Sequence, residues 1–314
     1  MKRRSAIRHL IVAGAVARFS RLSAGVTPQE STGFVIRSDV RLVLLDVAVK
    51  DRNGGLVGNL TKDNFTVLEN GHQQEITVFA NDDLPVTVGL VVDESRSMLP
   101  KRNEVLMASG DFLRTCNPQD EIFVLNFNDD VKRGLPAPML FSDNLDQLRA
   151  ALDRGVPEGM TALNDAIVDG LQQLQLGRRD KKALVLISDG GDNASQHTRA
   201  EMFAMVERSP ATIYTVALVD PTDTDWNPHI LRHLANLSGG EAFFVDDLSR
   251  LKPICEGIGR EIRRRYTIGY PPPPGKSGML RRIQVRVAAP GHTGLFARTR
   301  TAYRYEVLPD AAIK

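Results

Sequence analysis

Hydrophobic and polar residues follow two different periods along this chain. In the central part, near-continuous runs of Val, Ile and Leu alternate with amphipathic stretches of helical period. The apolar runs predict strands near residues 86–93, 121–128, 183–189, 212–219 and 241–245, with a short β-ribbon strand around 131–135. The amphipathic stretches predict helices near residues 102–115, 144–153, 162–175, 199–207, 228–237 and 250–265. Strands that are apolar throughout are buried on both faces, so residues 84–265 are expected to form a Rossmann-like, doubly wound α/β domain with a mainly parallel sheet.

The two flanks of this region alternate with the period of a half-buried β-sheet. Residues 34–82 and 266–306 are broken by turn signals such as Asn70-Gly71, which are typical of antiparallel strands. The alternating runs are residues 40–49, 64–69, 74–79, 266–270, 282–287 and 298–303. Neither flank alone has many strands. We therefore predict that the two flanks pair into one β-sandwich, with the α/β domain inserted between them.

Composition is that of a globular protein with about two domains. The chain has 314 residues, of which 42% are hydrophobic and 25% charged, and its net charge of +2 does not indicate nucleic acid. The cluster of arginines in 260–265 is expected to be a solvated helix end, where cations complement the helix dipole. Cys116 and Cys255 fall at opposite ends of predicted parallel helices, so we expect two unpaired, mostly buried thiols.

The N-terminus has the composition of an export signal. Lys2-Arg3-Arg4 precedes a short apolar stretch, a pattern that resembles a secretory signal peptide over residues 1–25. An extracytoplasmic protein, secreted or periplasmic, is therefore expected. Arg18 and Arg21 interrupt the apolar region early, so a membrane-retained signal anchor and a merely basic tail are the alternatives. No other segment is long and apolar enough to span a membrane.

Small oxygen-bearing side chains gather where the predicted central strands end. Asp93, Ser95 and Ser97 follow the first strand, Thr161 precedes a helix, and Asp189 ends another apolar run. In an open parallel sheet, ligands bind outside the carboxyl ends of the strands, so these side chains are expected to share one crevice. Hard oxygens without His or Cys favour Mg²⁺, Mn²⁺ or Ca²⁺ over zinc. The alternative is that the two hydroxyls of Ser95 and Thr161 only cap helices, which does not explain acids at the ends of two apolar strands.

This pattern of Asp93-x-Ser95-x-Ser97, Thr161 and Asp189 resembles the metal-ion-dependent adhesion site of the von Willebrand factor type A domain family. The resemblance covers roughly residues 84–265. It implies that Ser95, Ser97 and Thr161 bind Mg²⁺ directly, while Asp93 and Asp189 bind largely through water. It also implies an open metal position that accepts an Asp or Glu carboxylate from a protein partner. A further implication, which we treat as a hypothesis, is movement of the last helix, residues 250–265, on binding.

The flanks are similar to those of exported bacterial proteins that carry this domain between β segments. The similarity rests on alternating motifs such as Leu60-x-x-x-Asn64-Phe65-x-Val67 and Tyr266-x-Ile268-Gly269-Tyr270. It concerns the architecture more than the activity.

Other motifs give weaker signals. His229 and His233 stand at i, i+4, but Ile230 occupies the place of the Glu that a zinc protease needs. Residues 223–227 hint at a calcium loop, yet Pro228 and Leu234 replace the Gly and Glu of an EF-hand. We expect this acidic loop to rim the metal face instead.

Catalytic signatures are missing from the sequence. Residues 188–193 lack the lysine of a phosphate-binding loop, and no Gly-x-Ser-x-Gly elbow occurs. The sequence therefore predicts a metal-dependent protein-binding module without catalytic activity of its own. One alternative is a scaffold subunit of a bacterial complex in which the metal is mainly structural. Another is a metal-using hydrolase, for which we find no general base beyond the metal ligands.

Overall fold

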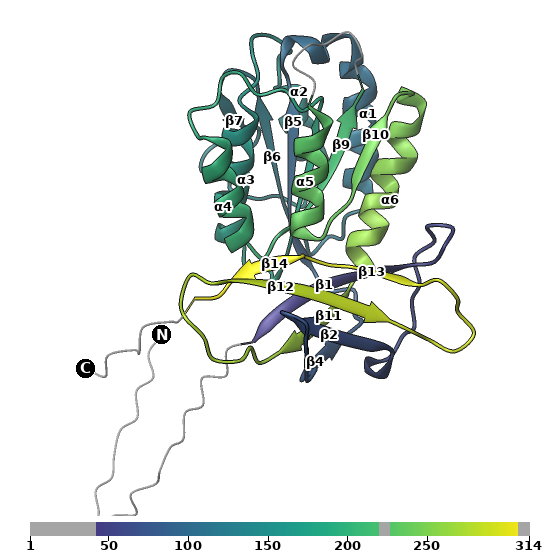
Figure 1. The fold of residues 1–314 in the computed structure, drawn as a ribbon. Helices are drawn as coiled ribbons and strands as arrows, with labels where there is room; N and C mark the ends of the chain where they lie inside the picture. The colour runs from purple at the N-terminus through teal and green to yellow at the C-terminus, as the bar shows by residue number, and fades with distance from the viewer. Residues whose placement is uncertain (1–41, 220–226, 307–314) are drawn as a thin grey trace, which may run out of the picture. The chain divides into compact units, whose positions relative to one another are not determined.

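The computed structural model describes residues 42–219 and 227–306. The α/β part of these residues is built on a six-stranded sheet in the order β10-β9-β8-β5-β6-β7 (Figure 1). Its strands are β5 (Val86–Asp93), β6 (Glu121–Phe127), β7 (Val131–Arg133), β8 (Lys181–Ser188), β9 (Thr212–Leu218) and β10 (Ala242–Val245). All neighbouring strands are parallel except β6 and β7, which form the antiparallel ribbon at one edge. The predicted doubly wound, mainly parallel sheet is confirmed, and β5 at its centre is buried at every position.

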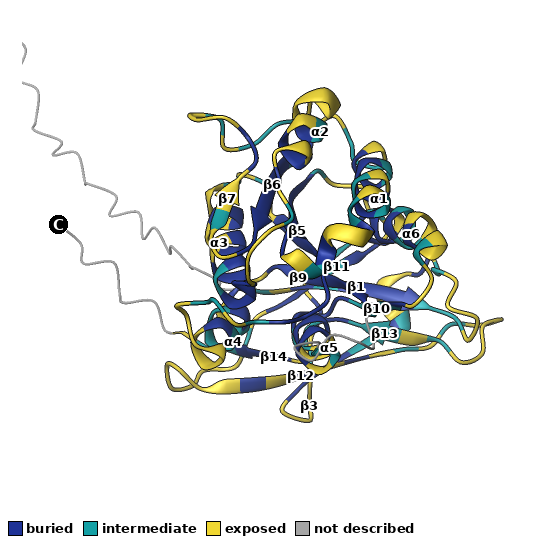
Figure 2. Ribbon diagram, turned by 90° about the horizontal axis from the view of Figure 1, so that it is seen from above, coloured by how far each residue is buried: buried dark blue, intermediate teal, exposed yellow. Residues whose placement is uncertain are grey.

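Helices cover both faces of this sheet. They are α1 (Arg102–Arg114), α2 (Leu145–Asp153), α3 (Leu163–Leu176), α4 (Arg199–Arg208), α5 (Pro228–Ser238) and α6 (Leu251–Arg263), each within two residues of its predicted bounds. Helix α1 packs against α2 and α6 on one face, and α4 packs against α3 and α5 on the other (Figure 2). The short 3₁₀ helices are η1 (Lys62–Asn64), η2 (Arg96–Lys101) and η3 (Leu248–Arg250).

Several helix ends are set by local capping residues. The Thr198 hydroxyl accepts a hydrogen bond from the Glu201 amide, and the Glu201 carboxylate binds back to Thr198, which forms a capping box at the start of α4. Helix α5 begins with Pro228 after the N-cap Asn227 and ends at Gly239, whose φ of 85° is the left-handed conformation of a C-cap. These caps explain why the periodic pattern located the helices closely.

The two flanks form a single β-sandwich. One sheet has the order β13-β1-β11-β4 and the other β14-β12-β2-β3. Their strands are β1 (Val43–Lys50), β2 (Phe65–Glu69), β3 (His72–Gln74), β4 (Val78–Ala80), β11 (Tyr266–Tyr270), β12 (Leu280–Val287), β13 (Phe296–Arg298) and β14 (Ala302–Arg304). N-terminal β1 pairs with C-terminal β11, and β2 pairs with β12. Because residues of both sheets share one apolar core, the predicted sandwich with an inserted α/β domain is confirmed.

The sandwich contains one tight hairpin turn within a sheet and two segments that cross from one sheet to the other. The β2–β3 hairpin turns at Asn70 (φ 49°) and Gly71 (φ 85°), as two positive φ angles in a tight turn require. The alternating runs 74–79 and 298–303 are each divided between the two sheets and do not form single strands. Between β13 and β14 the chain packs so closely on Gly239 that no side chain fits there. That contact with the end of α5 marks the point where the chain crosses from one sheet to the other.

A buried arginine joins the sandwich to the α/β domain. Arg265 is 3% exposed. Its guanidinium donates to the carbonyls of Asp46 (3.0 Å) and Arg298 (3.3 Å) in the sandwich and of Gly239 (2.7 Å) after α5. It also binds the Tyr214 hydroxyl at 2.8 Å and the Glu261 carboxylate at 3.2 Å. One side chain thus bonds to β1, β9, α6 and β13.

The cysteine prediction holds in the structure: Cys116 and Cys255 are both free, and Cys255 is buried while Cys116 is partly buried. Within residues 42–219 and 227–306, no helix has the length and apolar character needed to cross a membrane. The predicted signal peptide, residues 1–25, and most of the predicted acidic rim loop, residues 223–227, lie outside the described residues.

Candidate metal centre

The first part of the site lies where β5 runs into η2. Asp93 is the last residue of β5, and its Oδ1 accepts a hydrogen bond from the Ser95 amide at 2.8 Å. The hydroxyl oxygens of Ser95 and Ser97 are 3.1 Å apart. Ser95 is the N-cap residue of η2, but its side chain caps no amide. Helix capping therefore does not explain the Ser95 hydroxyl at this position.

The second part comes from the neighbouring strand β8. The Ser97 hydroxyl donates to Oδ2 of Asp189 at 2.6 Å. In the opposite direction, the Ser188 hydroxyl donates to Oδ2 of Asp93 at 2.6 Å. Two serine hydroxyls thus connect the segment at the end of β5 with the segment at the end of β8, and four of the predicted site residues lie together.

The loop before α3 brings the fifth predicted residue to this edge of the sheet. The Thr161 carbonyl accepts hydrogen bonds from the amides of Asn193 (2.9 Å) and Ala194 (3.1 Å), and the Asn193 side chain accepts from the Thr161 amide at 2.8 Å. Gly159, two residues earlier, accepts from the Arg96 amide of η2 at 3.4 Å. Among the described residues, no hydrogen bond engages the Thr161 hydroxyl. The N-cap of α3 is Ala162, so Thr161 does not cap that helix.

The electrostatics of the site favour a cation. Asp93 and Asp189 are each 1% exposed, and neither has an ion pair with Lys, Arg or His in the described part of the chain. Burial, and after it the nearby charge of Asp189, raise the pKa of Asp93 to about 7, against the hydrogen bonds from Ser188 and Ser95. Two adjacent buried carboxylates without a cationic partner are unfavourable unless a bound cation or a proton compensates them.

The donor set is one of carboxylates and hydroxyls. Within the described residues, no group of three or more His, Cys, Asp or Glu side chains converges on a metal position. The set of two aspartates and three hydroxyls contains only hard oxygens, which fits Mg²⁺, Mn²⁺ or Ca²⁺ and does not fit zinc. Of the two histidines weighed as zinc ligands, His233 packs edge-on against the ring of Phe203 at 4.6 Å.

Sequence reasoning missed the residues that support this set. Ser188 orients Asp93, and Asn193 holds the Thr161 backbone. Behind them, Asp192 accepts from the side chains of Asn164 (2.6 Å) and Ser195 (2.5 Å), which ties the β8–α4 loop to α3. A hydroxyl directly before Asp189 at a strand end was the available signal for Ser188.

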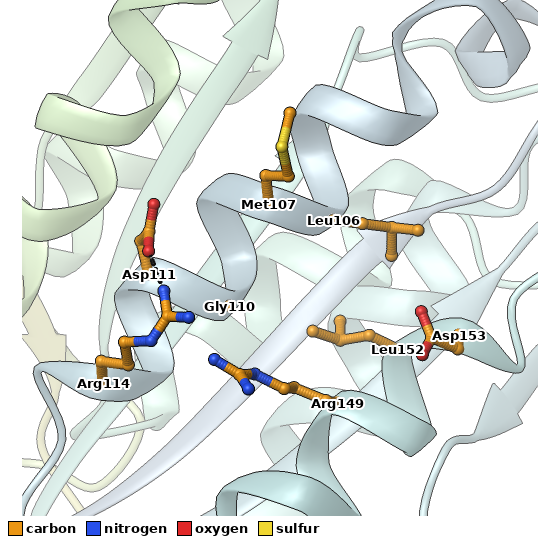
Figure 3. A pocket seen from close by; sticks show the side chains of 8 residues that line it. All are labelled: Leu106, Met107, Gly110, Asp111, Arg114, Arg149, Leu152 and Asp153. Atoms are coloured by element: carbon orange, nitrogen blue, oxygen red, sulfur yellow. Dashed lines mark hydrogen bonds and ion pairs between the residues drawn. The ribbon is translucent and has the colours of Figure 1, made fainter.

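A separate groove of about 400 Å³ lies between α1 and α2. Figure 3 shows the guanidinium groups of Arg114 and Arg149 turned toward the same space, with Asp111 bound to Arg114. Asp153 completes a lining with equal numbers of acidic and basic side chains. The balanced charge gives no preference for one class of ligand.

Comparisons with known proteins identify the family and the fold of the α/β domain. The family model of the von Willebrand factor type A domain matches residues 87–256. The solved structure of von Willebrand factor type A from Catenulispora acidiphila is 15% identical, covers 83% of this chain and 72% of its own, and has a TM-score of 0.50. No curated protein sequence matches the chain.

Two further solved structures match just over half of this chain. BatB from Bacteroides thetaiotaomicron is 18% identical over 56% of this chain and 98% of its own, with a TM-score of 0.45. The vWF domain of the type V pili tip protein Mfa5 from Porphyromonas gingivalis is 12% identical over 58% of this chain and 97% of its own, with a TM-score of 0.44. At such identities, similarity between structures concerns the fold alone.

Proposed function

This chain belongs to the von Willebrand factor type A domain family, and we propose that it is a metal-ion-dependent protein-binding module. In this proposal Ser95, Ser97 and Thr161 hold a divalent cation directly, and Asp93 and Asp189 hold it largely through water. Mg²⁺ is the expected ion, and Mn²⁺ or Ca²⁺ fit the same oxygens. The cation supplies a Lewis-acidic position that a partner's Asp or Glu carboxylate occupies.

The pair of buried aspartates supports this proposal most strongly. Asp93 and Asp189 lie at the carboxyl edge of the sheet, where α/β folds bind ligands, and no side-chain cation of the described residues neutralises them. A structural ion pair would leave such carboxylates compensated within the chain. Carboxylates that lack a cationic partner, beside hydroxyl oxygens, are what an oxygen-coordinated cation requires.

The chain's own residues position these donors in advance. Ser188 and the Ser95 amide fix both oxygens of Asp93. Asn193 fixes the loop of Thr161. Such support reduces the conformational freedom that binding would otherwise remove. We propose binding rather than catalysis, because the acids at this site are the ligands themselves and are not available as a general base.

A direct test combines removal of the metal with a substitution that removes one hydroxyl of the site. Ser97→Ala removes an oxygen that binds Asp189, and Ser249→Ala, on exposed η3, is the matched control. Calorimetric titration with Mg²⁺ should give binding for wild type and the control and a large loss for Ser97→Ala. Partner capture should require Mg²⁺ and fail in EDTA. Capture that is equal in Mg²⁺, in EDTA and with Ser97→Ala would exclude metal-dependent recognition.

The alternative of a scaffold subunit with a structural metal has its own outcome. In that case EDTA lowers stability, while partner capture by the folded protein does not depend on the ion. The mature N-terminus tests the proposed export. Cleavage near Ala24 supports an extracytoplasmic protein, and an intact Met1 on cytoplasmic protein supports the scaffold.

A further inference from the structure

A second concave surface, which shares no lining residue with the metal centre, lies between α6 and the loop that follows β1. This groove, which we call the α6 groove, has a volume of about 500 Å³. Pro253, Gly257, Arg260 and Arg264 of the α6 segment line one side, and the segment from Lys50 to Leu56 lines the other. We propose that the α6 groove binds an acidic peptide segment of a protein partner that carries an apolar side chain among its carboxylates.

The charge of the α6 groove is strongly unbalanced. Its lining includes Lys50, Arg250, Arg260 and Arg264 against a single carboxylate, Glu261. Lys50 and Glu261 form an ion pair at 2.7 Å, with side chains 12% and 3% exposed, so the charge offered to a ligand comes from the three arginines. The groove therefore presents a positive surface, which complements a run of carboxylates.

The arginines at the rim are available to a partner. Arg250 and Arg260 are each 58% exposed, and their carboxylate partners, Asp246 and Glu256, lie at 3.3 Å and 3.8 Å. Exposed pairs of this kind contribute little and exchange readily for a better-placed carboxylate. Arg264 is exposed and has no ion pair within the residues the structure describes. Planar guanidinium groups suit bidentate carboxylate recognition.

The floor of the groove is open at a glycine. Gly257 lies in the middle of α6, where glycine is less favourable than almost any other residue. A Cβ at Gly259 would collide with Thr115, which explains that glycine by close packing. A Cβ at Gly257 would meet only the Arg260 guanidinium, at 3.9 Å, so packing does not require glycine there. The missing side chain instead leaves space in the groove.

An apolar component distinguishes this surface from a simple anion site. Leu56, Phe243 and Ile254 contribute to the lining, and all three are partly exposed. A concave surface with an apolar floor and a basic rim can accept an apolar side chain of a peptide in the floor. The carboxylates on either side of that side chain would then contact the basic rim. A flat anionic membrane would contact the rim but would not fill the floor.

Gly257→Leu is the most selective test, because it fills the floor and leaves the charges in place. The probe is a fluorescein-labelled peptide in which glutamates flank two leucines, and binding is followed by fluorescence anisotropy. The expected result is at least about tenfold weaker binding for Gly257→Leu and for the double variant Arg260→Glu, Arg264→Glu. Arg199→Glu, an exposed arginine at the start of α4, is the matched control and should bind as wild type. Circular dichroism checks that each variant is folded.

Further measurements distinguish the α6 groove from the metal centre and from a membrane-binding surface. Peptide binding should persist in EDTA and with Ser97→Ala, so a failure here is distinct from a failure of the proposed metal site. It should weaken as the ionic strength rises, and a peptide with lysine in place of glutamate should not bind. The proposal is overturned if the groove variants bind the acidic peptide as wild type does. It is also overturned if anionic lipid vesicles bind the protein and the peptide does not.

Discussion

Replacing Arg265 by methionine tests whether one buried guanidinium fastens the sandwich to the α/β domain. Methionine keeps most of the unbranched stem and removes only the charged donors. The carbonyls of Asp46, Gly239 and Arg298 each lose a hydrogen bond, at 3.0, 2.7 and 3.3 Å in the native protein. Glu261 keeps bonds from Lys50 and Tyr214 but loses its third partner.

The expected magnitude follows from these losses. A buried acceptor without a donor costs about 1–3 kcal/mol, and removing one partner of a buried ion pair costs about 3–5 kcal/mol. The losses are not additive, because Asp46 and Arg298 are only partly buried and the remaining partners of Glu261 compensate. We expect the free energy of unfolding to fall by about 4 kcal/mol, with Tm lower by roughly 8–16 °C for a domain of this size.

Urea denaturation followed by circular dichroism measures this loss. Arg264→Met is the matched control, since Arg264 is the neighbouring arginine but is exposed. It should change the free energy of unfolding by no more than about 0.5 kcal/mol. If Arg265→Met is as stable as that control, the junction is not held by this side chain.

Three further predictions concern other parts of the molecule. Mg²⁺ at about a hundred times its Kd should raise the free energy of unfolding by about 2.7 kcal/mol, seen as a higher Tm than in EDTA, with no shift for Ser97→Ala. Glu69→Gln should destabilise the sandwich by about 3 kcal/mol in urea denaturation, because Glu69 is 2% exposed and accepts from Tyr270, Tyr303 and Arg281 at 2.8, 2.8 and 2.6 Å; a loss below about 1 kcal/mol would contradict this. Burial alone would raise the pKa of Asp165, but hydrogen bonds from the Gln196 and His197 amides and the His197 ring lower it. Its stabilisation is therefore complete above the unfolded pKa of about 3.9 and lost as pH falls through the lower folded pKa. The stability difference between wild type and Asp165→Asn, measured by urea denaturation, should shrink over that acid range, and a constant difference would count against the assignment.

Periodicity was sufficient to predict the elements of the α/β domain, but not the corners of the sandwich. Both sandwich sheets face the same core, so apolar positions along the chain do not mark where it crosses from one sheet to the other. Ile76, between β3 and β4, is 6% exposed, and Thr299, between β13 and β14, is 9% exposed. Both side chains lie inside the protein although neither residue belongs to a strand. Only contacts distant in sequence, such as that of Gly239 with the β13–β14 corner, reveal the crossing.

In the candidate site, the sequence likewise predicted the main residues but not every contact between them. Residue type and position at strand ends were enough to select Asp93, Ser95 and Asp189, because parallel strands bring their carboxyl ends to one edge. The hydrogen bond from Ser188 to Asp93 was not predictable. It depends on the register of β5 and β8, in which Val92 lies opposite Ile187, and register is a property of the packed sheet.

The buried charged network at the end of α6 limits how far this helix can move when a partner binds. The C-terminal end of α6 is held by Glu261, which bonds to Lys50 and Tyr214, and by Arg265 just beyond the helix. Shifting this end breaks a buried charged network at a cost of about 3–5 kcal/mol, whereas coupling between sites is typically about 1–3 kcal/mol. Movement of the whole helix is thus too costly, and any response to binding should be confined to the N-terminal turns near Leu251. Hydrogen exchange with and without Mg²⁺ and partner should leave the amides of residues 258–263 unchanged. Altered exchange at those amides would show that the junction opens and that α6 moves as a unit.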